Sequence, residues 1–169
     1  MLAFRNPFVW LWRFRHRKGY GIHSPFAFSL VTQVLYSPGR YYAYAWLDGL
    51  MSRWQRVLPS RRRACLRLLF RLANYWQPTE IMAPEGSLTE LAYLHAGCKA
   101  AQLSIGQDDN FVLHAESGTM FVVYDLQRHL PSWRKILADP RTSVTFDLYD
   151  IGVAFADMNL NRQDYVVNW

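Results

Sequence analysis

Residues 79–96 read TEIMAPEGSLTELAYLHA, and this stretch decides the fold class. Thr79 to Ala83 has the composition of a short buried strand, and Ser87 to Ala96 has the apolar spacing of a helix that follows it. In a nucleotide-binding unit of this kind, a glycine-rich turn between strand and helix lets the backbone approach the ligand. Here the turn is Pro84-Glu85-Gly86, with one glycine and a carboxylate. The stretch therefore predicts the scaffold of a cofactor site without the site itself.

The chain before this stretch has helical periodicity up to Trp76. Ser24-Pro25 predicts the start of a helix, because serine caps helices and proline suits their first turn, and Ser37-Pro38-Gly39 ends it. Two further helices are expected over 41–58 and from Pro59 onward. The arginines of the last helix are expected mostly to face away from the core; they are Arg61, Arg62, Arg63, Arg67 and Arg71.

From Gln77 onward the pattern predicts strands with short helices between them. Strand, helix and strand alternate at first, which predicts a parallel sheet, whereas the last three strands follow one another and predict an antiparallel edge. The expected strands cover residues 79–83, 100–105, 110–115, 119–125, 142–148, 152–155 and 164–169. The sequence thus predicts a helical N-terminal extension over 1–76 and a shortened α/β domain over 77–169.

Charge divides the chain at nearly the same place. Residues 1–75 carry thirteen Lys/Arg and one acid, Asp48, whereas residues 76–169 carry six Lys/Arg and twelve acids. One interpretation is a basic helical half docked on an acidic α/β half, within or between chains. The other is a surface for nucleic acid or anionic lipid.

The N-terminal segment from Phe4 to Lys18 mixes aromatic and basic residues. Such segments suit membrane interfaces and stacking on single-stranded nucleic acid, or they pack on the chain's own core. An apolar start followed by basic residues is the reverse of a secretory signal, and no apolar run approaches ~20 residues. We therefore expect a cytoplasmic protein, with a membrane-peripheral one as the alternative.

Residues 17–28 read RKGYGIHSPFAF. This stretch resembles the N-terminal signature of a bacterial subgroup of Rossmann-like, S-adenosylmethionine-dependent class I methyltransferases. The resemblance resumes at residues 68–78 and returns at 142–156 and 163–169. It implies an α/β fold with a reduced Rossmann-like, methyltransferase-like mixed sheet and an N-terminal helical extension.

The resemblance also implies where a cofactor would bind, and this chain departs from that pattern. The family's acidic position at the end of the first strand falls on Ala83, and its two glycine positions fall on Glu85 and Thr89. The acid that holds the ribose would fall near Ile105. Glu85, next to Gly86, would also place a negative charge close to the cofactor's carboxylate. We therefore expect no S-adenosylmethionine binding in the usual mode.

Two polar residues remain as weak catalytic candidates, His23 and Asp125. His23 lies between Gly21 and Pro25 and suits either a base or the ordering of a helix start. Asp125 ends a buried strand, a common place for functional carboxylates, although a solvated loop is the alternative. Asp147 and Asp150 are interpreted as exposed, and no metal site is expected because the histidines and cysteines lack metal spacing.

The sequence therefore predicts a methyltransferase-like protein with a binding or assembly role. The main alternative is a methyltransferase with a remodelled site around His23, Glu85 and Asp125. A third hypothesis is peripheral binding to an anionic surface through the basic half. A homo-oligomer, most simply a dimer, is expected because a shortened sheet leaves strand edges to be covered.

Overall fold

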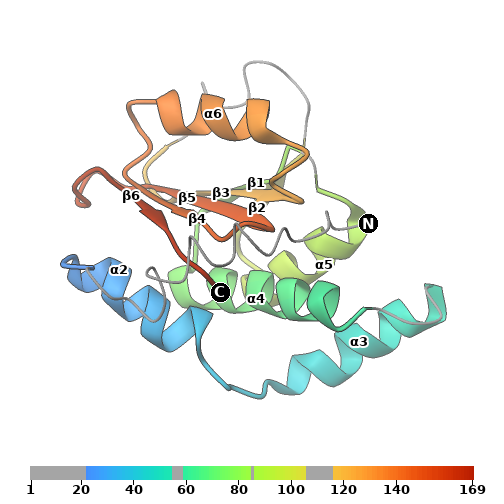
Figure 1. Ribbon diagram of the computed structural model, residues 1–169. Helices are drawn as coiled ribbons and strands as arrows, with labels where there is room; N and C mark the ends of the chain where they lie inside the picture. Colours follow the sequence, from blue (N-terminus) through green and yellow to red (C-terminus); the bar gives the residue numbers. More distant parts are fainter. Residues whose placement is uncertain (1–21, 55–58, 85, 106–115) are drawn as a thin grey trace.

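The computed structural model describes residues 22–54, 59–84, 86–105 and 116–169. It has an α/β fold with a six-stranded mixed sheet, which confirms the mixed sheet predicted from the sequence. Figure 1 shows helix α6 on one face of the sheet and the other helices on the opposite face, with α3 farthest from the strands. The segment from Phe4 to Lys18 lies outside the described residues.

The helices begin close to the expected positions. At the first one, the Ser24 hydroxyl accepts the N–H of Ala27 at 3.4 Å and Pro25 occupies the first helical position. The expected single helix continues as a π-helix, η2, which ends just before Tyr36. The helices are α2 (Pro25–Leu30), η2 (Val31–Leu35), α3 (Tyr42–Trp54), α4 (Ser60–Trp76), α5 (Leu88–Gly97) and α6 (Leu130–Ala138). Among these, none is long and apolar enough to cross a bilayer.

The described strands run in the order β2-β1-β3-β5-β4-β6 across the sheet. They are β1 (Glu80–Met82), β2 (Gln102–Ser104), β3 (Thr119–Tyr124), β4 (Val144–Asp147), β5 (Ile151–Ala156) and β6 (Gln163–Val166). β1 pairs in parallel with both β2 and β3, as the alternating pattern predicts. The strand expected over residues 110–115 lies outside the part of the chain that the structure describes.

The predicted antiparallel edge is wrong in its position. β5 is antiparallel to both β3 and β4 and lies inside the sheet, whereas the edge strand β6 is parallel to β4. The reason is that β4 and β5 form a hairpin whose second strand pairs with β3 along its whole length. Residues 157–162 then lead from β5 across to the other side of β4, where β6 pairs with β4.

Both faces of the sheet are buried, which explains why β3 is apolar without alternation. Met120 and Val122 belong to the core shared with α2, α4 and α5, whereas Phe121 and Val123 pack with Trp133 in the core under α6. The larger core contains residues from α2, η2, α3 and α4 as well as from the strands. The N-terminal helices therefore cover one face of the sheet.

Arg71 is the exception to the prediction that the arginines of α4 mostly face away from the core. It is buried, and its Nε donates to the Val34 carbonyl at 2.9 Å. Its other nitrogens lie 3.5 Å from the Leu35 carbonyl and 3.5 Å from the Tyr44 hydroxyl. The guanidinium thus binds the end of η2, where carbonyl groups of a helix terminus favour a positive charge.

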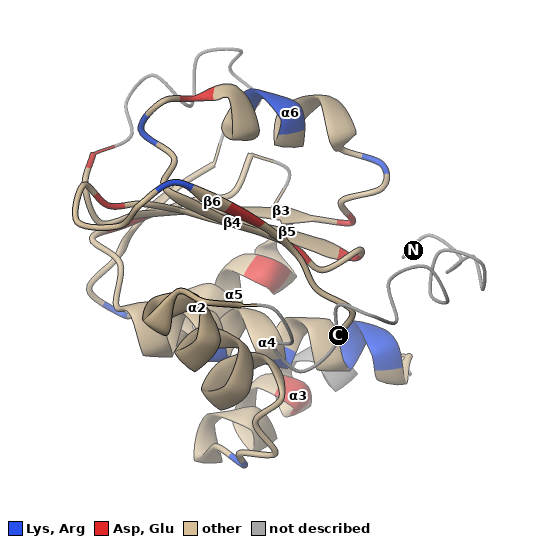
Figure 2. Ribbon diagram, turned by 60° about the vertical axis from the view of Figure 1, so that its left-hand side comes forward, with Lys and Arg blue, Asp and Glu red and all other residues tan. Residues whose placement is uncertain are grey.

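Ion pairs join the basic helices to the acidic sheet region within one chain. Arg61 of α4 lies 2.6 Å from Asp150, and Arg62 lies 3.7 Å from Glu90. Figure 2 shows acidic positions near the strand ends and basic positions on α4 and α6. These pairs support the interpretation in which the two oppositely charged halves dock on each other.

Candidate functional site

The order of the strands places a topological switch point between β1 and β3. From β1 the chain passes through α5 to β2 on one side, and β3 lies on the other side. In open α/β sheets, ligands bind beyond the carboxyl ends of the strands at such a point. The candidate site is therefore the region beyond the carboxyl ends of β1 and β3. It comprises Ala83 after β1, the start of α5, and Asp125 after β3.

The backbone of the turn after β1 is hydrogen-bonded to β2 and within the turn itself. The Ala83 N–H donates to the Ser104 carbonyl at 3.0 Å, and the Ala83 carbonyl accepts the N–H of Gly86 at 3.0 Å. A Cβ at Gly86 would lie 3.0 Å from the Cβ of Ala83, which is itself 1% exposed. The glycine is thus explained by packing against Ala83 and not by the approach of a ligand. Glu85 lies outside the described residues.

The start of α5 is occupied by a carboxylate of the chain. Ser87 and Glu90 form a capping box in which the Ser87 N–H donates to Glu90 Oε2 at 2.9 Å. Glu90 is only 3% exposed, and its other oxygen lies 3.7 Å from Arg62. A helix N-terminus is where a nucleotide-binding unit receives the negative charge of its ligand. Here Glu90 supplies that negative charge, and half-buried Thr89 stands beside it in the first turn.

Burial raises the pKa of the Glu90 carboxyl above its usual range, against the lowering effect of the Ser87 N–H and Arg62. A raised pKa stabilises the fold below the unfolded-state value, and this stabilisation is lost as pH rises through the raised value. Glu90→Gln keeps the capping box without ionising. We therefore predict that the free energy of unfolding of the wild type, relative to Glu90→Gln, falls as the pH rises above about 4, the usual pKa of a glutamate in an unfolded chain.

Urea denaturation of both proteins at a series of pH values from about pH 4 upward checks the prediction. Because the two proteins differ only at residue 90, the contributions of all other titrating groups cancel in the comparison. A difference that stays constant or grows in favour of the wild type would contradict a buried, destabilised carboxylate at α5.

Tyr124, the last residue of β3, directly precedes Asp125 and opens the polar segment that the sequence places after this strand. Its hydroxyl is buried and has no hydrogen-bond partner among the described residues. Burial raises its pKa, and the charges that act on it include Glu90, Arg62 and Asp150. The sequence signal that marks Glu90 is the Ser-x-x-Glu spacing of a capping box.

Asp125 is used by the turn that follows β3. Its backbone is left-handed, with φ 52°, and its carboxylate lies 3.3 Å from Arg128. The Arg128 N–H also donates to the Asp125 carbonyl at 2.8 Å. The carboxylate is buried and paired, so Asp125 orders the passage from β3 to α6 and is not the solvated loop residue of the sequence alternative.

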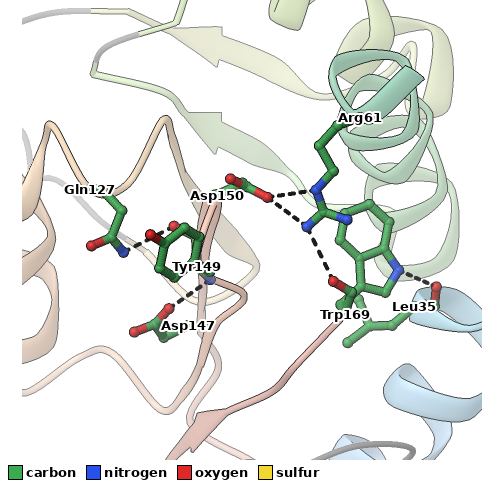
Figure 3. Close-up of polar contacts among 7 residues, drawn as sticks. All are labelled: Leu35, Arg61, Gln127, Asp147, Tyr149, Asp150 and Trp169. Atoms are coloured by element: carbon green, nitrogen blue, oxygen red, sulfur yellow. Dashed lines mark hydrogen bonds and ion pairs between the residues drawn. The ribbon is translucent and has the colours of Figure 1, made fainter. Parts of the chain in front are cut away.

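Asp150 is buried, which corrects the interpretation of this residue as exposed. Figure 3 shows its carboxylate facing Arg61, whose Nε donates to it at 2.7 Å. The same guanidinium donates to the Trp169 carbonyl at 3.2 Å and lies 4.5 Å from the centre of the Trp169 ring. The Trp169 indole N–H in turn donates to the Leu35 carbonyl at 2.5 Å. This cluster ties the β4–β5 turn, α4, η2 and the last residue together.

His23 and Asp125 are not brought together. His23 is exposed and precedes Ser24, which is hydrogen-bonded to Tyr165 of β6. β6 is three strands away from β3, which at ~4.8 Å per strand is about 14 Å. His23 therefore marks the start of α2, and Asp125 marks the end of β3.

A separate open pocket of about 500 Å³ lies beside the amino ends of β3 and β4, at the other end of the sheet's strands from the candidate site. It includes Arg141 and Arg162, whose guanidinium groups are engaged with Asp139 and with the carbonyl of Leu137. The bond from Arg141 lowers the pKa of Asp139. The pocket is lined by Ser117, Pro140, Arg141, Thr142, Ser143, Ala156, Asp157, Met158, Leu160 and Arg162. Because its cations bind the chain itself, we assign it no ligand.

Within residues 22–54, 59–84, 86–105 and 116–169, no group of three or more metal-ligating side chains gathers. Compared with known proteins, the chain matches no family model, no curated protein and no solved structure. The function is therefore argued from the geometry of the switch point.

Proposed function

We propose that this chain is a methyltransferase-like protein that has lost conventional S-adenosylmethionine binding and acts by binding or assembly. The observation that carries the proposal is the Glu90 carboxylate at the start of α5, held by the Ser87 N–H at 2.9 Å. A cofactor that presents its own carboxylate there would meet a like charge in a buried setting.

The turn before α5 supports the same conclusion. The family resemblance expects an acid where Ala83 stands, and Ala83 is buried and hydrogen-bonded into the sheet ladder. It offers no side-chain acceptor to a ligand. Gly86 is packed on Ala83, so the backbone there is closed by its own contacts.

We predict that S-adenosylmethionine does not raise the melting temperature of the wild type. A ligand at one hundred times its dissociation constant would stabilise the folded state by about 2.7 kcal/mol. For a chain of this length that corresponds to a shift of roughly 5–10 °C. Differential scanning fluorimetry with S-adenosylmethionine, and with S-adenosylhomocysteine as a matched ligand lacking the methyl group, checks this. A concentration-dependent rise with either ligand would overturn the proposal.

For the assembly role, we predict a homodimer in solution. β2, three residues long, and β6 are the two outer strands of the described sheet, and such edges commonly need covering. Light scattering coupled to size exclusion checks the mass. A monomer across a wide range of concentrations would contradict the prediction.

A further inference from the structure

The outward side of α3 exposes two aromatic rings. Tyr42 is fully exposed and Trp46 is 62% exposed. They are one helical turn apart and so share one side of the helix, where exposed Ala45 also lies. The opposite side of α3 is buried through Tyr44 and Leu47. The helix is therefore apolar both toward the core and toward the outside, and the outer apolar side has no occupant among the described residues.

Beside Trp46 the surface has an open hollow of about 290 Å³, lined by Ala45, Trp46, Gly49 and Leu50. A Cβ at Gly49 would meet nothing within 4 Å, so the hollow is open over that residue. None of the four side chains except the Trp46 indole carries a hydrogen-bond donor. The side chains of the hollow therefore offer few donors to a phosphate, and those of Ala45, Trp46 and Leu50 can contact hydrocarbon.

The part of the chain that contains α3 is basic. Residues 22–76 contain eight Arg and one acid, Asp48. The Asp48 carboxylate forms ion pairs with Arg67 at 2.5 Å and with Arg63 at 3.7 Å, and it accepts a hydrogen bond from the Tyr93 hydroxyl at 2.6 Å. Both arginine side chains stay substantially exposed, and exposed Arg40 precedes the helix. Exposed Arg40, together with two partly exposed arginines at the single carboxylate of Asp48, therefore favours a negatively charged occupant.

We propose that the α3 surface (Arg40, Tyr42, Ala45, Trp46, Gly49 and Leu50) binds the surface of an anionic lipid bilayer. The helix lies in the plane of the interface, with Tyr42 and Trp46 at the boundary between headgroups and acyl chains. Arg40, with the exposed parts of Arg63 and Arg67, attracts the anionic headgroups. This inference is independent of cofactor binding at the switch point.

A second copy of the chain fits this surface less well. It would bring two basic surfaces together, at a cost in like-charge repulsion. The four aromatic rings of two copies would bury on the order of 600–1,000 Å², below the about 1,200 Å² at which specific interfaces begin. The dimer predicted above concerns the sheet edges, which are distinct from α3.

Flotation of the full chain with vesicles tests the proposal. One set is phosphatidylcholine alone, and the other contains about 30% phosphatidylserine. We expect binding to the anionic vesicles that weakens with salt. The double variant Tyr42→Ser/Trp46→Ser should lower the partition coefficient about tenfold or more, because two rings no longer leave water. Arg40→Glu should weaken binding to the anionic vesicles only.

Met158→Ser is the matched control, because Met158 is also a highly exposed apolar side chain but lies between β5 and β6. It should bind vesicles as the wild type does, and all variants should keep the wild-type melting temperature because the replaced side chains are exposed. Equal binding of the wild type to both vesicle sets, or no binding, would overturn the inference. So would a double variant that binds like the wild type, or one that instead loses dimerisation or binding to single-stranded RNA.

Discussion

Replacing Phe26 by Ala is expected to lower the free energy of unfolding by about 3 kcal/mol. The Phe26 ring lies 5.2 Å from the Trp76 ring and 5.3 Å from the Phe155 ring, both edge to face. These three residues belong to α2, α4 and β5, so Phe26 joins the first helix to the sheet. Truncation removes both aromatic contacts and leaves a cavity between two large rings that cannot easily close it.

Urea denaturation of the variant gives the change directly. Phe28→Ala is the matched control, because Phe28 lies on the same helix but is half exposed and should change stability by about 0.5 kcal/mol or less. His23→Ala should also have little effect, since His23 is exposed. If Phe26→Ala kept full stability while abolishing a binding activity, the segment would be a binding site and not a structural joint.

Arg71→Ala is expected to cost about 2–4 kcal/mol. The guanidinium donates to the carbonyls of Val34 and Leu35 at the end of η2, at 2.9 Å and 3.5 Å. Alanine would leave the Val34 carbonyl buried without this donor and would remove the packed side chain between α4 and η2. The end of η2 should then loosen from α4.

Thermal and urea denaturation of Arg71→Ala and Arg71→Lys check this. Lysine keeps the charge but cannot reach several acceptors in one plane, so its stability should fall between the wild type and the alanine variant. Arg134→Ala on α6 is the matched control, because Arg134 is exposed and its loss should matter by about 0.5 kcal/mol or less. Equal effects of Arg71→Ala and Arg134→Ala would show that the buried contacts contribute little.

Local sequence signals predicted the parts of the fold that depend on neighbouring residues. Ser24-Pro25 marks the start of α2 because the serine hydroxyl caps the helix and proline needs no amide partner there. The apolar run of β3 marks a strand buried on both faces. The Pro84-Glu85-Gly86 sequence predicts a turn after β1 that differs from a glycine-rich loop, and Ala83 and Gly86 pack on each other there.

Features that depend on distant pairing could not be predicted in this way. Asp150 looks like a solvated turn residue until Arg61, 89 positions away, pairs with it. Arg71 looks like a residue on the outer side of α4 until η2 folds across it. The inner position of β5 follows from its pairing with β3, because adjacency in sequence identifies the β4–β5 hairpin but not the strand beside it.

Isothermal titration calorimetry of the wild type with S-adenosylmethionine tests the central claim most directly. Because Glu90 already supplies the negative charge at the start of α5 and Ala83 offers no acceptor, we expect no saturable heat at physiological cofactor concentrations. A saturable isotherm with a micromolar dissociation constant would contradict the claim, and would show that the switch point still receives the cofactor.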